Sequence, residues 1–232
     1  MSMLGRFLEL ALVTQNPGAD WSALQRLGFA DAPTGDVWTH PYGVVACEGL
    51  AIGLHAAGEE PLQLVFVRPD VAALERELGA RFIEVEATRL GSDVFNELGV
   101  REPGGMLLRV IEARTFSPPA ELPARTALGR FLTTSLPCPD LGDARLFWER
   151  LDMEVLGAED PWPSINVAGL PVACHEAASC QETLLLFDGA GARDEAALHA
   201  AGIRSSRSLP ALRARRHRVV RGIAGLTAIL LD

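Results

Sequence analysis

Two short stretches of the chain carry residue types that do chemistry in other proteins. His175-Glu176 begins like the metal-binding pattern His-Glu-x-x-His, but Ser179 stands where the second histidine belongs. The stretch also falls at the end of an expected strand, where two histidines cannot share one helical face. We therefore expect no zinc-protease site there.

The second stretch, Gly189-Ala190-Gly191, follows an apolar run and precedes a helix, as a dinucleotide-binding loop would. Asp194 replaces the third glycine of that pattern and places a carboxylate where a pyrophosphate would approach. We interpret the stretch as an ordinary strand–helix turn. The chain has no lysine, which excludes Schiff-base chemistry and a phosphate-loop lysine, and it has no Gly-x-Ser-x-Gly nucleophile motif.

The cysteines do not indicate a chemical site. Cys47, Cys138, Cys174 and Cys180 show no Cys-x-x-Cys spacing, and a chain with a core of normal size does not need disulfides. We expect reduced, mostly buried thiols. Cys174 and His175 are neighbours in a strand, so their side chains point to opposite faces and do not form a nucleophilic pair.

The formal net charge of −9 argues against nucleic acid as a partner, because such affinity comes from neutralising phosphates. The charge is unevenly distributed. Residues 193–221 contain eight arginines and two acidic residues, a net charge of +6, which leaves −15 for the rest of the chain. This segment is interpreted first as a solvated face that pairs with the acidic part of the molecule. The alternative is recognition of a carboxylate or phosphate by guanidinium groups.

Length and composition indicate a folded globular chain. Of its 232 residues, 48% are apolar, enough for two domains of ordinary size with a core each. No apolar run approaches the roughly 18 residues that span a bilayer, and the first residues lack a signal-peptide pattern. The expectation is a cytoplasmic protein with no membrane partner, as a monomer or a homodimer.

The elements that must position any site recur four times. Gly5-Arg6-Phe7-Leu8 returns as Gly129-Arg130-Phe131-Leu132, and each half contains two successions of strand, helix and three strands. In the first succession, one of the later strands is expected near Val37. In the second, we expect the three later strands at 82–85, 93–98 and 106–112. Asp70 and Asp140 stand just before apolar periodic stretches, and we expect them to cap helices. A proline-rich linker at 116–127 separates a domain at 1–115 from one at 128–232. The units cover about 5–57, 60–115, 129–178 and 181–232.

Four units of this kind resemble the vicinal oxygen chelate superfamily, which includes glyoxalase I, extradiol dioxygenases and bleomycin-resistance proteins. The resemblance rests on the helix end Leu27-Gly28-Phe29, on Gly49-Leu50-Ala51-Ile52-Gly53-Leu54-His55, and on Glu102-Pro103-Gly104-Gly105 with the strand after it. It implies an α+β fold of two tandem domains. In each domain, two paired βαβββ units form a curved mixed sheet around a cleft.

The resemblance also implies metal ligands on the first and last strands of each unit. In the first domain, the matching positions are Glu9, Gly53, Gln63 and Arg109, with His55 as a substitute for the glycine. A divalent metal would then use Glu9, His55 and Gln63. The opposing interpretation is an ion pair of Glu9 with Arg109, and His55 in contact with water. In the second domain, the matching positions (Thr133, Ala173, Thr183 and Ile229) cannot hold a metal, which leaves His175 alone.

We therefore expect a protein that binds a small molecule, which can be an anion, in an apolar cleft without a metal. Trp38 and Trp162 are expected to line the two clefts. The expected cleft residues are Glu9, Trp38, His55, Gln63, Arg109, Trp162 and His175. The alternative is a metal-dependent lyase, isomerase or dioxygenase with its site in the first domain. No catalytic residue is assigned.

Overall fold

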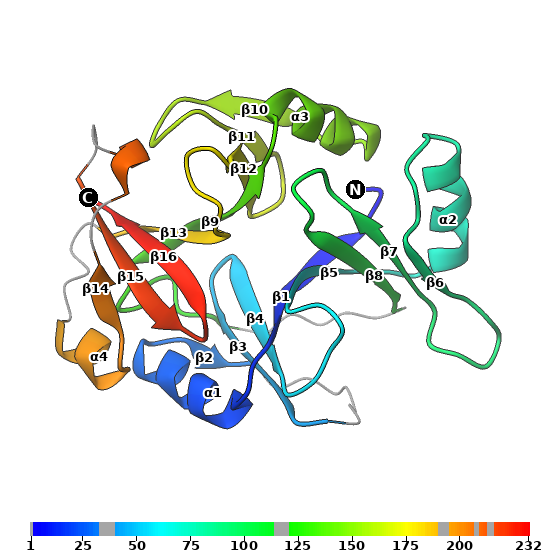
Figure 1. Cartoon of the computed structure of the whole chain (residues 1–232). Helices are drawn as coiled ribbons and strands as arrows, with labels where there is room; N and C mark the ends of the chain where they lie inside the picture. The colour runs from blue at the N-terminus through cyan, green and yellow to red at the C-terminus, as the bar shows by residue number, and fades with distance from the viewer. Residues whose placement is uncertain (1, 33–39, 114–120, 190–194, 207–208, 213–215) are drawn as a thin grey trace.

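The computed structural model describes residues 2–32, 40–113, 121–189, 195–206, 209–212 and 216–232. It contains two mixed sheets of eight strands each, one formed by each half of the chain (Figure 1). The first sheet consists of β1 (Arg6–Val13), β2 (Ala30–Asp31), β3 (Tyr42–Cys47), β4 (Leu50–His55), β5 (Leu62–Arg68), β6 (Ala87–Arg89), β7 (Glu97–Arg101) and β8 (Leu107–Glu112).

The second sheet follows the same plan. It consists of β9 (Arg130–Cys138), β10 (Val155–Ala158), β11 (Ser164–Val167), β12 (Val172–Glu176), β13 (Leu184–Asp188), β14 (Arg204–Ser206), β15 (His217–Ile223) and β16 (Leu226–Leu231). The strand orders are β2-β3-β4-β1-β5-β8-β7-β6 and β10-β11-β12-β9-β13-β16-β15-β14. Each sheet is thus two units joined through their first strands, which confirms the predicted fold class.

The α-helices of the described residues lie on the outside of the sheets (Figure 1). They are α1 (Pro17–Arg26), α2 (Val71–Gly79), α3 (Leu141–Arg150) and α4 (Glu195–Ala200), and a 3₁₀ turn covers Pro210–Leu212. The expected caps are present: Asp70 accepts from the Ala73 N–H at 2.8 Å, and Asp140 from the Asp143 N–H at 2.9 Å. None of the helices among these residues is long and apolar enough to cross a bilayer.

The repeated Gly-Arg-Phe-Leu stretch has the same structural role in both sheets. Gly5 and Gly129 have φ values of +89° and +112°, and a Cβ on either would lie 2.2 or 2.1 Å from a backbone carbonyl oxygen of the neighbouring strand. Only glycine permits both the conformation and the close approach. The phenylalanine two residues later packs edge-to-face on its neighbour in each sheet, Phe7 on Phe66 and Phe131 on Phe187.

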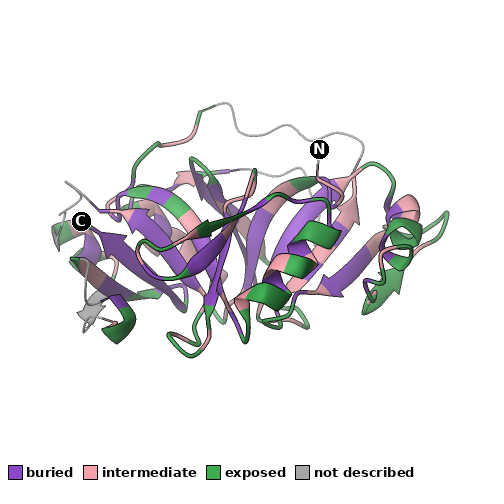
Figure 2. Cartoon of the chain, turned by 90° about the horizontal axis from the view of Figure 1, so that it is seen from above, coloured by how far each residue is buried: buried purple, intermediate pink, exposed green. Residues whose placement is uncertain are grey.

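A single hydrophobic core joins the two halves. It contains Leu10 and Leu74 from the first half and Leu136 and Trp148 from the second, all fully buried. Figure 2 shows that buried residues follow the strands, whereas exposed residues lie on the helices and in the loops. The boundaries 1–115 and 128–232 remain a prediction, because the halves share this core.

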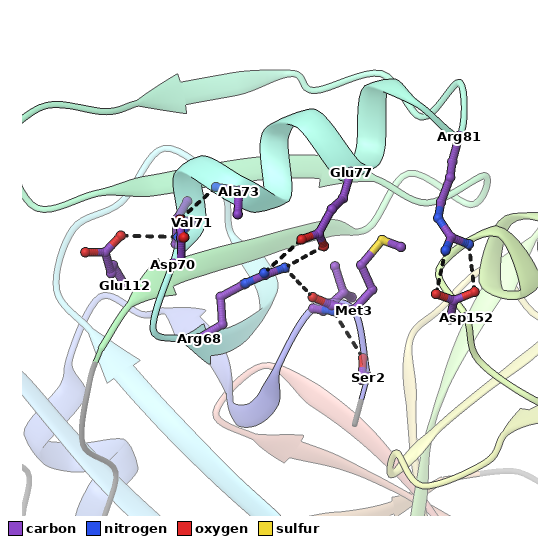
Figure 3. A network of polar contacts seen from close by, with 11 residues as sticks. Ser2, Met3, Arg68, Asp70, Val71, Ala73, Glu77, Arg81, Glu112 and Asp152 are labelled. Atoms are coloured by element: carbon purple, nitrogen blue, oxygen red, sulfur yellow. Dashed lines mark hydrogen bonds and ion pairs between the residues drawn. The ribbon is translucent and has the colours of Figure 1, made fainter.

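At the surface, polar contacts connect the two halves and hold α2 on the first sheet. Arg81, which follows α2, makes a two-pronged ion pair with Asp152, which follows α3, at 2.7 and 2.6 Å (Figure 3). The figure also shows Arg68 of β5 bonded to Glu77 of α2 and to the backbone oxygen of Met3. The two halves are therefore held by a shared core and by a polar contact at its edge.

Two of the predicted strands are wrong in position. No strand forms at 82–85, because Phe82 takes a left-handed conformation (φ 56°) after α2, and the chain becomes extended only at β6. Residues 93–96 belong to a turn, in which the Gly91 N–H donates to the Asn96 side-chain oxygen at 2.8 Å. The strand near Val37 lies outside the described residues. All four cysteines are free thiols, as expected.

Candidate functional site

Alternation along four central strands turns one set of side chains away from the hydrophobic core. Ala11 of β1 lies opposite Gly53 of β4 on one side and Gln63 of β5 on the other. The same face carries Glu9, His55 and Arg109, because residues two apart in a strand share a face. We call this the cavity face of the first sheet. Its neighbours in sequence, such as Leu10 and Leu64, point to the core and are fully buried.

A chain of polar side chains crosses the cavity face. The Tyr42 hydroxyl donates to Glu9 Oε2 at 2.8 Å, and Glu9 Oε1 lies 3.5 Å from His55 Nε2. His55 Nδ1 lies 3.1 Å from His40 Nε2. Glu9 and His55 are only 3% and 5% exposed. A buried carboxylate needs such partners, because water cannot solvate it there.

Arg109 is not the partner of Glu9. Its guanidinium pairs with Glu97 of the adjacent strand, with Nε donating to Oε2 at 2.9 Å. The predicted Glu9–Arg109 ion pair is therefore wrong, and His55 is nearly buried, with 5% of its surface exposed. The register explains the choice: Glu97 lies opposite Ile111, two residues from Arg109 on the same face of β8.

A cavity of about 360 Å³ opens over this face of the first sheet. Its apolar walls come from residues such as Ala11, Val13 and Leu107. Its polar groups include His40, His55, Glu59, Glu60, Gln63, Arg89, Glu97 and Arg109. The volume lies within the range of about 300–1,000 Å³ that small-molecule sites occupy. A second, much smaller hollow of about 20 Å³ lies deeper, between Glu9, Tyr42, His55 and Gln63. His55, Gln63 and Arg109 border both spaces, whereas Glu9 borders only the smaller one.

The charges around the larger cavity are mostly paired. Glu60 receives the Arg101 guanidinium at 2.8 Å, and Glu97 receives Arg109. Arg89 has no ion-pair partner among the residues that the structure describes, and it is exposed at the cavity rim. A guanidinium in this state is the group best placed to meet a negative charge on a ligand.

The fold resemblance implies a divalent-metal site on this face, but the residues present there do not fit one. Gly53 offers no donor, and Arg109 brings a permanent positive charge. A Cβ at position 53 would lie 2.4 Å from Glu9 Oε1, so the Glu9 carboxylate fills the space through which a ligand at 53 would project. Only Glu9, His55 and Gln63 remain. Within the described ranges, no three His, Cys, Asp or Glu side chains are grouped so that they could hold an ion.

The corresponding face of the second sheet is largely filled. Trp162, 4% exposed, packs with Leu184, Leu186, Leu212 and other apolar side chains over the strands. Beside it remains a hollow of about 250 Å³. His175 is fully buried: its Nδ1 lies 2.7 Å from Ser135 Oγ, and its Nε2 lies 2.9 Å from the carbonyl oxygen of Cys180. Burial lowers the pKa of His175, and the hydrogen bond to that carbonyl opposes the shift only in part.

Sequence reasoning found some of these residues and missed others. Glu9, His55, Gln63 and Arg109 do come together at one face, whereas Trp162 and His175 lie at the other. Trp38 lies outside the described residues, as does much of the arginine-rich segment; its described Arg221 pairs with Glu182 at 2.6 Å. His40 and Glu97 were missed. The available signal was the strand pairing, because Tyr42 lies opposite His55 and brings His40 near it.

The sequence matches no protein-family model and no curated relative. Solved structures, in contrast, share the fold over nearly the whole chain. A Mn(II)-bound glyoxalase from Novosphingobium aromaticivorans aligns with 13% identity and a TM-score of 0.61, covering 99% of this chain and 82% of that one. An extradiol ring-cleaving dioxygenase from B. fuscum aligns with 14% identity and a TM-score of 0.60, covering 98% and 71%.

A catechol 2,3-dioxygenase aligns with 14% identity and a TM-score of 0.57, covering 98% of this chain and 86% of that one. These proteins belong to the superfamily that the sequence resembles. Identities this low establish the shared fold and no shared chemistry. The chain has the fold of the vicinal oxygen chelate superfamily, built as two halves of two βαβββ units each.

Proposed function

We propose that this protein binds a small organic anion in the cavity of the first sheet, without a metal. The observation that carries the proposal is the cavity of about 360 Å³, with apolar walls, histidines on its lining and Arg89 at its rim. An apolar body would lie against Ala11, Val13 and Leu107, and a single carboxylate would meet Arg89. Glu59, which has no ion pair among the described residues, would repel a more highly charged anion.

The polar chain supports this function by holding the lining rigid. Tyr42 and Glu9 hold His55, and His55 contacts His40, so the two rings have few alternative positions. A preorganised lining loses less entropy when a ligand binds. Gln63 adds an amide at the same wall, which can both donate and accept hydrogen bonds.

The ligand class can be tested with a matched pair of probes, benzoate and benzyl alcohol, in thermal unfolding. A ligand that binds only the folded state raises the melting temperature, by about 2.7 kcal/mol of stabilisation at one hundred times its Kd. We expect a shift with benzoate and a smaller one with benzyl alcohol. Arg89→Gln should remove the difference, whereas Arg76→Gln, an exposed arginine of α2, should keep it. Equal shifts in wild type and Arg89→Gln would contradict the proposal.

The second candidate function is a metal-dependent lyase, isomerase or dioxygenase using Glu9, His55 and Gln63. It is favoured by the Mn(II)-bound glyoxalase among the structures of the same fold, and by the 3.5 Å between Glu9 Oε1 and His55 Nε2. Elemental analysis of protein purified without chelator distinguishes the two. We expect no stoichiometric divalent metal and no loss of stability in EDTA. A stoichiometric metal that disappears in His55→Ala would overturn our proposal in favour of this one.

A further inference from the structure

The second half contains a serine–histidine pair that the proposed function does not use. Ser135 lies on β9 and His175 on the adjacent parallel strand β12, two positions apart in register, so their side chains share one face. Ser135 Oγ and His175 Nδ1 are 2.7 Å apart, and the two residues are 1% and 0% exposed. This distance is within the range of about 2.6–3.2 Å expected for a nucleophile and its base.

The hydrogen-bond partners determine the direction of the contact. His175 Nε2 lies 2.9 Å from the carbonyl oxygen of Cys180, which can only accept, so Nε2 carries the ring proton. In the neutral ring, Nδ1 is then an acceptor, and the Ser135 hydroxyl must donate to it. Burial lowers the pKa of His175, which keeps the ring neutral near pH 7. The histidine is thus set as a base towards the serine, with a third group orienting it.

Ser135 also borders a space in which a reaction can occur. It lines the hollow of about 250 Å³ together with Trp162, Ser164, Asn166 and Leu186. Asn166 lies opposite Ala173, which lies opposite Ser135, so the Asn166 amide is on the same face two strands away. That amide can donate to the oxygen of a carbonyl held near Ser135. The apolar part of the lining, which includes Leu132, Trp162 and Leu186, and the small volume suit a short acyl group.

The first half shows that the fold does not require this hydroxyl. The repeat places Ser135 on Ala11 and His175 on His55, and Ala11 has nothing that could donate to a histidine. There, His55 is held by Glu9 and His40 instead. The serine is therefore a specific feature of the second half.

We propose that Ser135 is an acylatable nucleophile, with His175 as its base and the Cys180 carbonyl as the orienting group, towards esters of short carboxylic acids. Ser135 Oγ bonds to the ester carbonyl carbon while its proton passes to His175 Nδ1. The bond from that carbon to the leaving oxygen then breaks, and the leaving oxygen takes the proton from Nδ1. The products are acyl-Ser135 and an alcohol, and water releases the acid by the same steps in reverse order.

The use of the Cys180 carbonyl as the orienting group predicts that ester hydrolysis turns over slowly. A carbonyl stabilises an imidazolium less than a carboxylate does, and loss of the triad carboxylate costs about 10⁴ in kcat in serine proteases. Among the described contacts, no acidic side chain bonds to His175. We therefore expect the acyl form to accumulate at one acyl group per chain, and not rapid hydrolysis.

The test is acylation of the full chain with p-nitrophenyl acetate. We expect a burst of one p-nitrophenolate per chain, and an acetyl group located by mass spectrometry on the peptide that contains Ser135. Ser135→Ala should abolish the burst, and His175→Gln should slow it by about 10²-fold or more. Ser92→Ala, which removes an exposed hydroxyl of the first half far from this hollow in the sequence, should leave it unchanged.

Folding of the variants is checked by their melting curves. If His175→Gln does not fold, Asn166→Ala replaces it, and it should slow acylation several-fold while Ser135 remains the labelled residue. A burst of wild-type size in Ser135→Ala, or an acetyl group found only at Cys180 or another residue, would overturn the proposal. Because Ser135 does not line the first cavity, these outcomes are independent of anion binding there.

Discussion

In the first half, the cavity face carries Glu9, His55 and Gln63 below a hollow of about 360 Å³. In the second half, the corresponding residues are Thr133, His175 and Thr183, and Trp162 covers part of the strands. The backbone plan of the two sheets is the same. The histidine is retained in both, but its partners are a carboxylate and a second histidine in one half, and a hydroxyl and a carbonyl in the other.

The difference shows that the scaffold and the site groups change independently. The core-facing residues pack against the shared core in both halves. The residues of the two cavity faces do not pack against that core, so they can differ between the halves. One face is polar beneath a hollow of about 360 Å³, and the other is partly covered by apolar side chains around Trp162, beside a hollow of about 250 Å³. Substitutions in either half can test this difference between the two faces.

The largest effect is expected from opening the closed face. Trp162→Ala removes an indole that is 4% exposed and packed on Leu184, Leu186 and Leu212. Truncation of a buried tryptophan costs about 3–5 kcal/mol, because the neighbours fill the cavity only in part. Urea unfolding followed by far-UV circular dichroism measures this cost. The half-buried Trp21 of α1 serves as the control, and Trp21→Ala should cost less. A cost for Trp162→Ala below that of the control would show that the second face is not held by its apolar cover.

A smaller effect is expected from filling the open face. Gly53→Ala would place a Cβ 2.4 Å from Glu9 Oε1, and such overpacking costs about 1–3 kcal/mol. Glu9→Ala in the same chain removes the clash, so the double variant should lose less than the sum of the two single losses. Gly79→Ala in α2 is the matched control, because a Cβ there meets nothing within 4 Å. Additive losses in the double variant would mean that Glu9 does not lie over Gly53.

The smallest effect concerns the pH dependence of the unfolding free energy, to which His175 of the second half contributes. Burial lowers the pKa of His175 below its unfolded value, so the unfolded chain binds more protons at this residue. The associated stability is fully present above the unfolded pKa of about 6.5, and it is lost as the pH falls from there towards the folded pKa. The slope contributed by one such group is at most about 1.4 kcal/mol per pH unit.

Unfolding free energies of wild type and His175→Gln, measured between pH 7.5 and about pH 5, isolate this contribution. Their difference should be largest at pH 7.5 and should shrink as the pH is lowered. A difference that stays constant, or grows towards acid pH, would mean that His175 is not buried in its neutral form.

Much of the scaffold could be predicted because local rules govern it. Asp70 and Asp140 cap their helices as their positions before apolar periodic stretches indicate. The strands at 82–85 and 93–98 were misplaced because Phe82 takes a left-handed turn and Asn96 closes a loop through its side chain. Apolar content does not reveal either event, since both depend on backbone geometry and a polar contact.

The candidate site could be predicted only as a set of residues on one face. Alternation in the strands places Glu9, Gln63, His55 and Arg109 together, but it does not say which of them pair. The partner of Arg109 is Glu97, which belongs to a strand whose bounds were predicted at 93–98 and observed at Glu97–Arg101. His40 was missed because it lies outside any strand, and only the pairing of β3 with β4 brings it to His55.

The sequence by itself determined the repeat, and the structure shows why its glycine recurs. Gly5 and Gly129 are required at the start of each half, because a side chain would collide with a backbone carbonyl at about 2 Å in both sheets. Only the tertiary structure decided which side-chain contacts each copy of the repeat makes. Whether Glu9 meets Arg109 or His55, and whether a sheet face stays hollow or is covered by Trp162, depends on contacts between strands far apart in sequence, and no local pattern encodes such contacts.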